Sequence, residues 1–174
     1  MSSASAESPG PGPLAALPEG RLQGRQVFAD LVAQGLATAA AEGWNRLVLA
    51  DPDFADWPLG ERSVVASLQD WAARGRSLHM IAHDYRAVRE RHPRFVQWRV
   101  TWSHLFEARA CSGVPSGELP SAFWSPAWTL ERIDVAHGVQ IASRLPARRV
   151  ALGERLDQWW QKGSPSFPAV TLGL

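Results

Sequence analysis

The sequence predicts a single-domain α/β protein with a mixed sheet flanked by helices. Three observations indicate this class. Segments with helical spacing of apolar residues alternate with short apolar runs in the first half of the chain, a group of strand-like segments follows, and an amphipathic segment closes the chain. The length of 174 residues and the hydrophobic content of 45% suit one domain with one core. We place this domain at residues 21–163.

Two end segments flank the predicted domain. Residues 1–20 are rich in Ser, Pro, Gly and Ala and contain few large apolar side chains. Such a segment buries too little apolar surface to offset the entropy lost on ordering, so we predict a disordered N-terminal arm. Residues 164–174 are predicted to form an extended tail.

The first predicted elements are a helix and a buried strand. Large apolar residues, beginning with Leu22, recur every three to five positions, which predicts an amphipathic helix from residue 21 to about Gly43. The apolar run NRLVLA at residues 45–50 predicts a buried strand, and the turn-forming sequence DPD at residues 51–53 ends it.

A second helix and strand repeat this arrangement. Residues 61–74 carry their apolar side chains on one side of a helix, which Gly75 closes. The run SLHMIA at residues 77–82 predicts a second buried strand. Because a helix connects the two strands, we expect them to be parallel neighbours in one sheet.

Two short helices and an ambiguous segment come next. We predict a helix at residues 85–91, a break at Pro93, and a second helix that extends to Trp102. The segment Leu105–Cys111 suits a third strand, although its pattern also allows the helix to continue.

The last third of the chain predicts antiparallel strands and a closing helix. A loop rich in Gly, Pro and Ser leads to the short apolar run at residues 122–124. Residues 128–134 and 138–143 alternate like the two strands of a hairpin. Pro146 suits the first position of a final helix, whose apolar side includes two tryptophans.

The composition excludes several kinds of site. A formal net charge of +1 gives no general attraction to nucleic acids or anionic membranes. The single cysteine, Cys111, excludes an internal disulfide and any multi-cysteine metal site. Lys162 is the only lysine and follows no glycine-rich loop, which excludes a phosphate-binding loop of the Walker type. We therefore predict no cofactor and no metal.

The sequence gives no indication of export or of membrane insertion. The N-terminus lacks the positive start and the continuous apolar run of a signal peptide. No stretch approaches the roughly 20 apolar residues of a membrane span. We expect a cytoplasmic, soluble protein with no membrane partner.

The ends of the two predicted parallel strands supply candidate ligand-binding residues. Asp51 and Asp53 follow the first strand, and His83 and Asp84 follow the second. Ligands of parallel α/β sheets bind beyond the carboxyl ends of the strands, where these side chains would converge on one rim. The alternative is structural: the aspartates form a turn and a helix cap, and His83 satisfies a backbone group.

A metal site at His79 and His83 is not supported. Their spacing suits a metal only on a helix, whereas the run in which His79 lies predicts a strand.

An arginine-rich stretch follows this rim. Between residues 84 and 104 there are five arginines and two acidic residues, with two tryptophans interleaved. The candidates for anion or nucleic-acid contact are Arg86, Arg89, Arg94 and Arg99. Arginines and aromatic rings on one face can contact phosphates and stack on bases. The alternative is a solvated helix face whose arginine stems cover apolar surface.

Three stretches resemble small bacterial proteins of the phospholipase-D-like superfamily. They are RQVFADLVAQGLATAAAEGWNRLVLADPDF, LQDWAARGRSLHMIAHD and, after the strand hairpin, DQWWQKG. The resemblance covers about residues 21–162. It implies a phospholipase-D-like α/β sandwich, in a superfamily whose single-copy members commonly dimerise to complete a site.

The catalytic signature of that superfamily is H-x-K-x4-D, in which the histidine is the nucleophile and the lysine binds phosphate. The nearest positional candidate begins at His137, with Val139 in place of the lysine and Arg144 in place of the aspartate. Valine cannot bind phosphate, and arginine cannot orient the histidine as a carboxylate would. The resemblance therefore implies a member that has lost phosphodiesterase chemistry, and no catalytic residue is carried over.

Our leading hypothesis is a non-catalytic binding or interaction module that forms a homodimer. The first alternative is an enzyme that uses the rim of Asp51, Asp53, His83 and Asp84 for acid–base chemistry. The second is a nucleic-acid-contacting protein that uses the arginines at residues 86–99.

Overall fold

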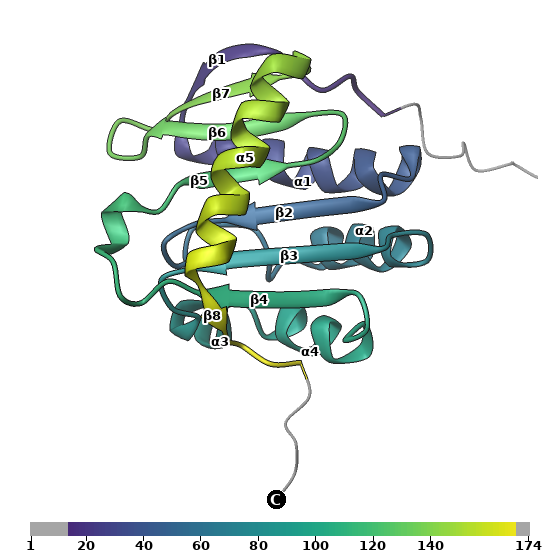
Figure 1. Ribbon diagram of the computed structural model, residues 1–174. Coiled ribbons are helices and arrows are strands. Elements are labelled where there is room, and N and C mark those ends of the chain that lie inside the picture. The colour runs from purple at the N-terminus through teal and green to yellow at the C-terminus, as the bar shows by residue number, and fades with distance from the viewer. Residues whose placement is uncertain (1–13, 170–174) are drawn as a thin grey trace, which may run out of the picture.

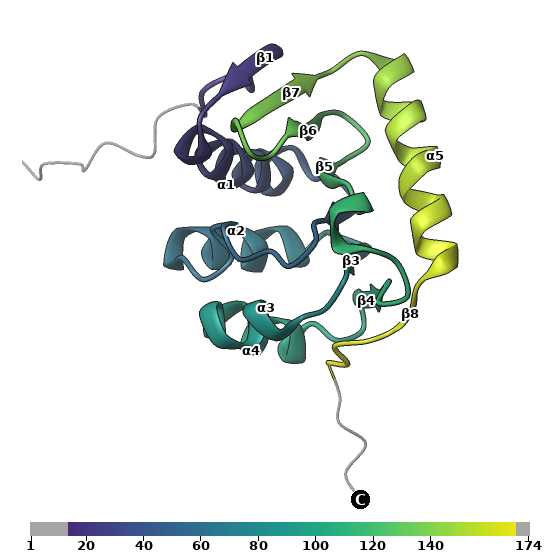
Figure 2. The ribbon, with the colours of Figure 1, turned by 90° about the vertical axis from the view of Figure 1, so that its left-hand side faces the viewer.

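A computed structural model describes residues 14–169. One eight-stranded mixed sheet forms the centre, in the order β1-β7-β6-β5-β2-β3-β4-β8 (Figure 1). Helices α1 to α4 cover one face of the sheet, and α5 lies alone on the other face (Figure 2). The predicted α/β class with a mixed sheet flanked by helices is confirmed.

The strands are β1 (Gly20–Gln23), β2 (Arg46–Ala50), β3 (Ser77–Ala82), β4 (Phe106–Ala110), β5 (Ser121–Trp124), β6 (Thr129–Asp134), β7 (Val139–Ser143) and β8 (Ser164–Pro165). The helices are α1 (Arg25–Glu42), α2 (Arg62–Ala72), α3 (Arg86–Arg91), α4 (Pro93–Thr101) and α5 (Pro146–Lys162), and a 3-10 turn η1 covers Ser116–Glu118.

The N-terminal part of the domain differs from the prediction. Leu22 belongs to β1, which pairs antiparallel with β7, and α1 begins only at Arg25. Gly24 separates the two elements with φ of 126°, a conformation that L side chains rarely adopt. The prediction of one continuous helix from residue 21 was therefore wrong at its start, because the apolar Leu22 fits either period.

The segment before β1 packs on the domain. Leu17 is buried, and the indole Nε1 of Trp128 donates a hydrogen bond to the carbonyl of Pro18 at 3.0 Å. Packed structure therefore begins before the predicted boundary at residue 21. Residues 1–13 of the predicted N-terminal arm lie outside the described residues.

The centre of the sheet is parallel, as predicted. β2 pairs parallel with β3 and β3 pairs parallel with β4, so α2 and the α3–α4 pair are crossover connections. The ambiguous segment Leu105–Cys111 contains strand β4. In this strand Phe106 and Ala108 are buried on the helix-covered side, whereas Glu107 is exposed, which is the period of a strand.

The other half of the sheet is antiparallel. β5, β6 and β7 form a meander, and β5 pairs antiparallel with β2. The predicted hairpin of β6 and β7 is confirmed, with a turn at residues 135–138.

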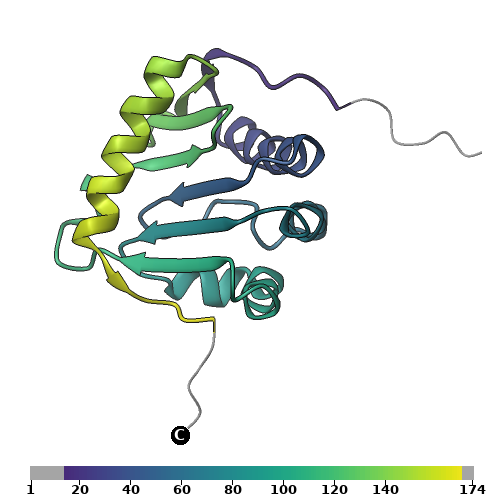
Figure 3. The same cartoon turned by 45° about the vertical axis from the view of Figure 1, so that its right-hand side comes forward.

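The two faces of the sheet are packed unequally. The main core lies between the sheet and α1 to α4, and it includes five buried tryptophans: Trp44, Trp57, Trp71, Trp98 and Trp128. A smaller cluster lies under α5, which crosses the strands and buries only Leu152 and Leu156 (Figure 3). No described helix is long and apolar enough to cross a membrane.

The C-terminal tail passes around the β4 edge of the sheet. β8 pairs antiparallel with β4, and Phe167 then inserts into the core on the helix-covered side, with its side chain 1% exposed. Residues 170–174 of the predicted tail lie outside the described residues.

Candidate functional site

The predicted rim exists as a junction of two strand ends. The Asp51 N–H donates to the Ile81 carbonyl at 3.1 Å, and the His83 N–H donates to the Pro52 carbonyl at 3.0 Å. The backbones that follow β2 and β3 therefore lie side by side. Their carboxylates, however, turn toward different partners.

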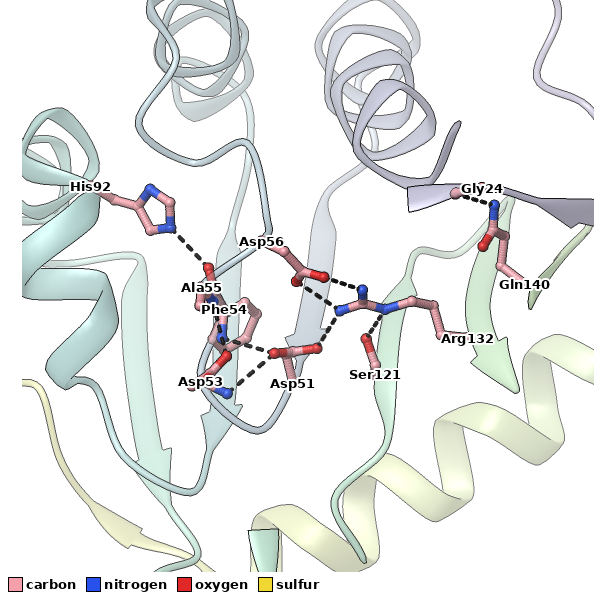
Figure 4. A network of polar contacts seen from close by, with 10 residues as sticks. All are labelled: Gly24, Asp51, Asp53, Phe54, Ala55, Asp56, His92, Ser121, Arg132 and Gln140. Carbon is pink, nitrogen blue, oxygen red and sulfur yellow. Dashed lines mark hydrogen bonds and ion pairs between the residues drawn. The ribbon is translucent and has the colours of Figure 1, made fainter. Parts of the chain in front are cut away.

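Asp51 forms the centre of a buried polar network (Figure 4). Its Oδ1 accepts a hydrogen bond from Nη2 of Arg132 on β6 at 2.8 Å, and both side chains are only 3% exposed. Arg132 also donates to both carboxylate oxygens of Asp56, and its Nε donates to the Ser121 hydroxyl at 2.8 Å. The network joins the loop after β2 to strands β5 and β6.

The charges in this network stabilise one another. Burial alone raises the pKa of the Asp56 carboxyl, but hydrogen bonding and attraction to Arg132 outweigh burial and lower it below its usual value. Burial lowers the pKa of the Arg132 guanidinium, and the two aspartates outweigh burial and raise it. The guanidinium also lies 4.0 Å from the ring centroid of Phe28 on α1. Arg132 therefore stays charged although it is buried.

The second oxygen of Asp51 fixes the loop that follows it. Its Oδ2 accepts hydrogen bonds from the backbone N–H groups of Asp53 at 3.1 Å and Phe54 at 2.8 Å. Phe54 has φ of 58°, and its carbonyl lies 2.8 Å from Nε2 of the buried His92. Because a carbonyl only accepts, Nε2 of His92 is the donor in this hydrogen bond. The loop conformation is thus held from both sides.

This arrangement is a closed structural junction. Both carboxylate oxygens of Asp51 are already used, and Arg132 donates four hydrogen bonds to described residues. Of the three charged side chains Asp51, Asp56 and Arg132, only Asp56 has appreciable exposure, with 36% of its side chain accessible. A ligand that competes for Asp51 would have to open the network first.

The other three rim residues reach solvent. Asp53 accepts a hydrogen bond from the Ala55 N–H at 2.9 Å, and Asp84 accepts one from the Arg86 N–H at 3.0 Å. The Arg86 N–H is also the largest cause of the lowered pKa of Asp84. His83 contacts Asp84 at 3.4 Å. No hydrogen bond or ion pair between described residues joins Asp51 or Asp53 to this pair.

The arginine-rich stretch does not present a single free face. Arg99 is buried, donates to the carbonyls of Val96 at 2.7 Å and Pro168 at 3.0 Å, and lies 3.8 Å from the ring centroid of Phe167. Arg94 donates to the Gly60 carbonyl at 3.0 Å. The side chains of Arg86 and Arg89 are exposed, and Arg89 also lies over the Phe167 ring. Burial lowers the pKa of Arg99.

His79 lies on the face of the sheet that α5 covers. Its ring stacks on Trp160 of α5 with centroids 4.2 Å apart, and its Nε2 lies 3.7 Å from Glu107. Within residues 14–169, no group of three or more His, Cys, Asp or Glu side chains could hold a metal ion.

The stacking of His79 predicts a pH dependence of stability. Burial against α5 lowers its pKa below 6.5, more than Glu107 raises it, so the folded state prefers the neutral ring. The unfolded chain then binds the proton more readily, and the free energy of unfolding should fall as the pH decreases below about 6.5. Denaturant unfolding above and below this pH measures the loss. In His79→Phe, which keeps an aromatic stack, the decrease should be smaller, and equal decreases in both proteins would contradict this role.

Comparison with known proteins supports the fold and not a family. Neither a scan of protein-family models nor a search of curated protein sequences finds a match. Among solved structures, the chain is similar to TrmBL2, an archaeal chromatin protein whose structure shows a mode of DNA binding, with a TM-score of 0.60 and 14% identity. The alignment covers 84% of this chain and 53% of TrmBL2, so this chain spans about half of that protein.

The fold is also similar to that of Nuc from Salmonella typhimurium, a phospholipase D family member. The TM-score is 0.50 and the identity is 10%, over 75% of this chain and 88% of Nuc. At these identities the similarity establishes the fold alone. The α/β fold that the sequence resemblance implies is thus shared with a phospholipase D family member.

The nearest match to the H-x-K-x4-D signature lies in the turn between β6 and β7. His137 is exposed, and its Nδ1 lies 2.8 Å from the Asp134 carboxylate. Val139 is buried in β7, and Arg144 follows the end of that strand. The segment serves as a hairpin turn.

The sequence did not reveal the other residues of this network. Asp56, Ser121 and Arg132 were not among the predicted site residues, and neither was the buried His92. The one available signal was the alternation of β6, which places Arg132 on the same face as the core residue Leu130. A charged residue on a core face implies a buried partner.

Proposed function

We propose that this chain is a non-catalytic binding or interaction module on a phospholipase-D-like scaffold. The observation that carries this proposal is the separation of the groups that phosphodiesterase chemistry would combine. Each histidine is engaged by a neighbour other than lysine: His79 by Trp160, His83 by Asp84, His92 by Phe54, His104 by Trp102 and His137 by Asp134. Lys162 lies 5.0 Å from the ring centroid of Trp159. No described contact pairs it with an imidazole.

The rim supports the same proposal. A phosphoryl-transfer site needs a nucleophile and preorganised cationic donors that are free to meet the substrate. The buried cation beside the rim, Arg132, already donates to Asp51, Asp56 and Ser121. Asp53, His83 and Asp84 remain available for a ligand, because all three reach solvent.

A double-stranded DNA fragment and a generic chromogenic phosphodiester test this proposal together. We expect no turnover of either substrate by the purified chain. Turnover by the wild type that is lost in His83→Ala or His137→Ala would overturn the proposal and show that the chain is an enzyme. The same DNA tests the arginine stretch. Because Arg94 and Arg99 are already engaged, we expect no salt-sensitive binding at low ionic strength.

We also propose that two copies associate, as the resemblance to single-copy members of the superfamily implies. Multi-angle light scattering should give twice the mass of 19.1 kDa. A single mass of 19.1 kDa at every concentration tested would reject the homodimer and leave the binding module unaffected.

A further inference from the structure

A hollow lies between α5 and the sheet, on the face opposite the Asp51 network. Its volume is about 190 Å³. Residues of β2, β5 and one flank of α5 line it, and those used below are Arg46, Trp124, Arg149, Val150, Glu154 and Asp157. The volume is below the ≈ 300–1,000 Å³ typical of sites for drug-sized ligands. A ligand about the size of an amino acid would fit.

Trp124, which lines the hollow, is hydrogen-bonded to α5. The indole Nε1 of Trp124 donates to the Arg149 carbonyl at 2.9 Å, which fixes the ring against α5. Gly153 permits this close approach, because a Cβ at that position would lie 3.2 Å from the same nitrogen. The Arg46 guanidinium lies 5.3 Å from the centroid of the indole ring. The hollow therefore has a preformed aromatic surface.

The side chains that line the hollow carry charges of both signs. Arg46 forms an ion pair with Asp157 at 3.5 Å, with both side chains well exposed. Arg149 and Glu154 line the same hollow, and neither forms an ion pair with any residue between 14 and 169. A simple anion would meet two carboxylates as well as two guanidinium groups, whereas a ligand with both charges can satisfy both.

From this charge pattern we infer that the hollow binds a small zwitterion with an apolar body, such as a free α-amino acid. Its carboxylate pairs with Arg149, its ammonium group with Glu154, and its side chain lies over Trp124 and the exposed Val150. The inference rests on the proposed binding function and names its ligand class.

Thermal-shift screening of the standard α-amino acids, followed by calorimetry, tests the inference. The amino acid that raises Tm most is compared with its two matched analogues, the carboxylic acid without the amino group and the amine without the carboxyl group. We expect the amino acid to raise Tm and to bind at least about tenfold more tightly than either analogue, because each analogue leaves one charged partner unpaired. If no amino acid raises Tm, or if one analogue binds equally well, the inference fails.

Three variants locate the site. Arg149→Gln and Glu154→Gln should each weaken binding of the amino acid about tenfold while leaving Tm without ligand unchanged, because neither side chain has a described ion-pair partner. Arg148→Gln, on the opposite flank of α5, is the control and should bind normally. Unchanged affinity in the first two variants would place the ligand elsewhere and overturn the inference. This failure is distinct from that of the proposed function, which depends on phosphodiester turnover.

Discussion

Replacing Arg132 with methionine should lower the free energy of unfolding by about 3–5 kcal/mol. The substitution removes the only described cation that pairs with Asp51, whose carboxylate is 3% exposed. A buried carboxylate without its partner loses far more than the hydrogen bonds themselves, because its desolvation is no longer compensated. Denaturant unfolding monitored by tryptophan fluorescence measures the change in midpoint.

Two further variants make the result specific to burial. Arg155→Met breaks the partly exposed pair of Arg155 with Glu131, whose side chains are 50% and 21% exposed, and it should cost about 1 kcal/mol or less. The double variant Asp51→Asn/Arg132→Met should be more stable than the sum of its single variants predicts, since no buried charge is left alone at residue 51. If Arg132→Met costs no more than Arg155→Met, the network does not stabilise the fold as described.

Phe167→Ala should destabilise the protein by a similar amount, about 3–5 kcal/mol. The ring is 1% exposed, stacks on Tyr85 with centroids 4.9 Å apart, and lies 3.8 Å from the guanidinium carbon of Arg99. Truncation leaves a cavity and removes the aromatic cover of a buried cation. Thermal and denaturant unfolding measure the loss.

A conservative variant and a surface variant complete this test. Phe167→Leu keeps most of the apolar volume and should cost clearly less than alanine. Leu145→Ala removes an apolar side chain that is 59% exposed, and it should change stability by no more than about 0.5 kcal/mol. Equal effects of Phe167→Ala and Leu145→Ala would show that the tail does not contribute to the core.

Local patterns were sufficient for most of the fold. The parallel strands β2 and β3 are nearly continuous apolar runs, and the hairpin of β6 and β7 alternates, so both could be predicted from neighbouring residues. Strands β1 and β8 could not be predicted in this way. Each has few residues and gains its hydrogen bonds from a strand far away in the sequence, so nothing local distinguishes it from a coil or a helix start.

In the candidate site, too, local patterns predicted some residues, whereas residues in long-range contacts were missed. Asp51 could be predicted because a turn follows an apolar run. Asp84 accepts a hydrogen bond from the N–H of Arg86, the first residue of α3, although Tyr85 and not Asp84 is the N-cap of that helix. Arg132 was missed because its contact with Asp51 spans 81 positions of sequence. Arg99 was grouped with surface arginines, although Phe167 and the Pro168 carbonyl enclose it. Both omissions are long-range contacts that only the tertiary structure creates.

The passage of the C-terminal tail from one face of the sheet to the other links the behaviour of distant parts of the chain. Few apolar side chains of α5 pack on the sheet, but the C-terminal end of the helix continues directly through β8 to Phe167 in the main core. Lifting the C-terminal end of the helix therefore requires extraction of that ring. Amide hydrogens of α5 and of β8 should consequently exchange with solvent as one cooperative unit, with α5 protected beyond what its own thin packing would provide.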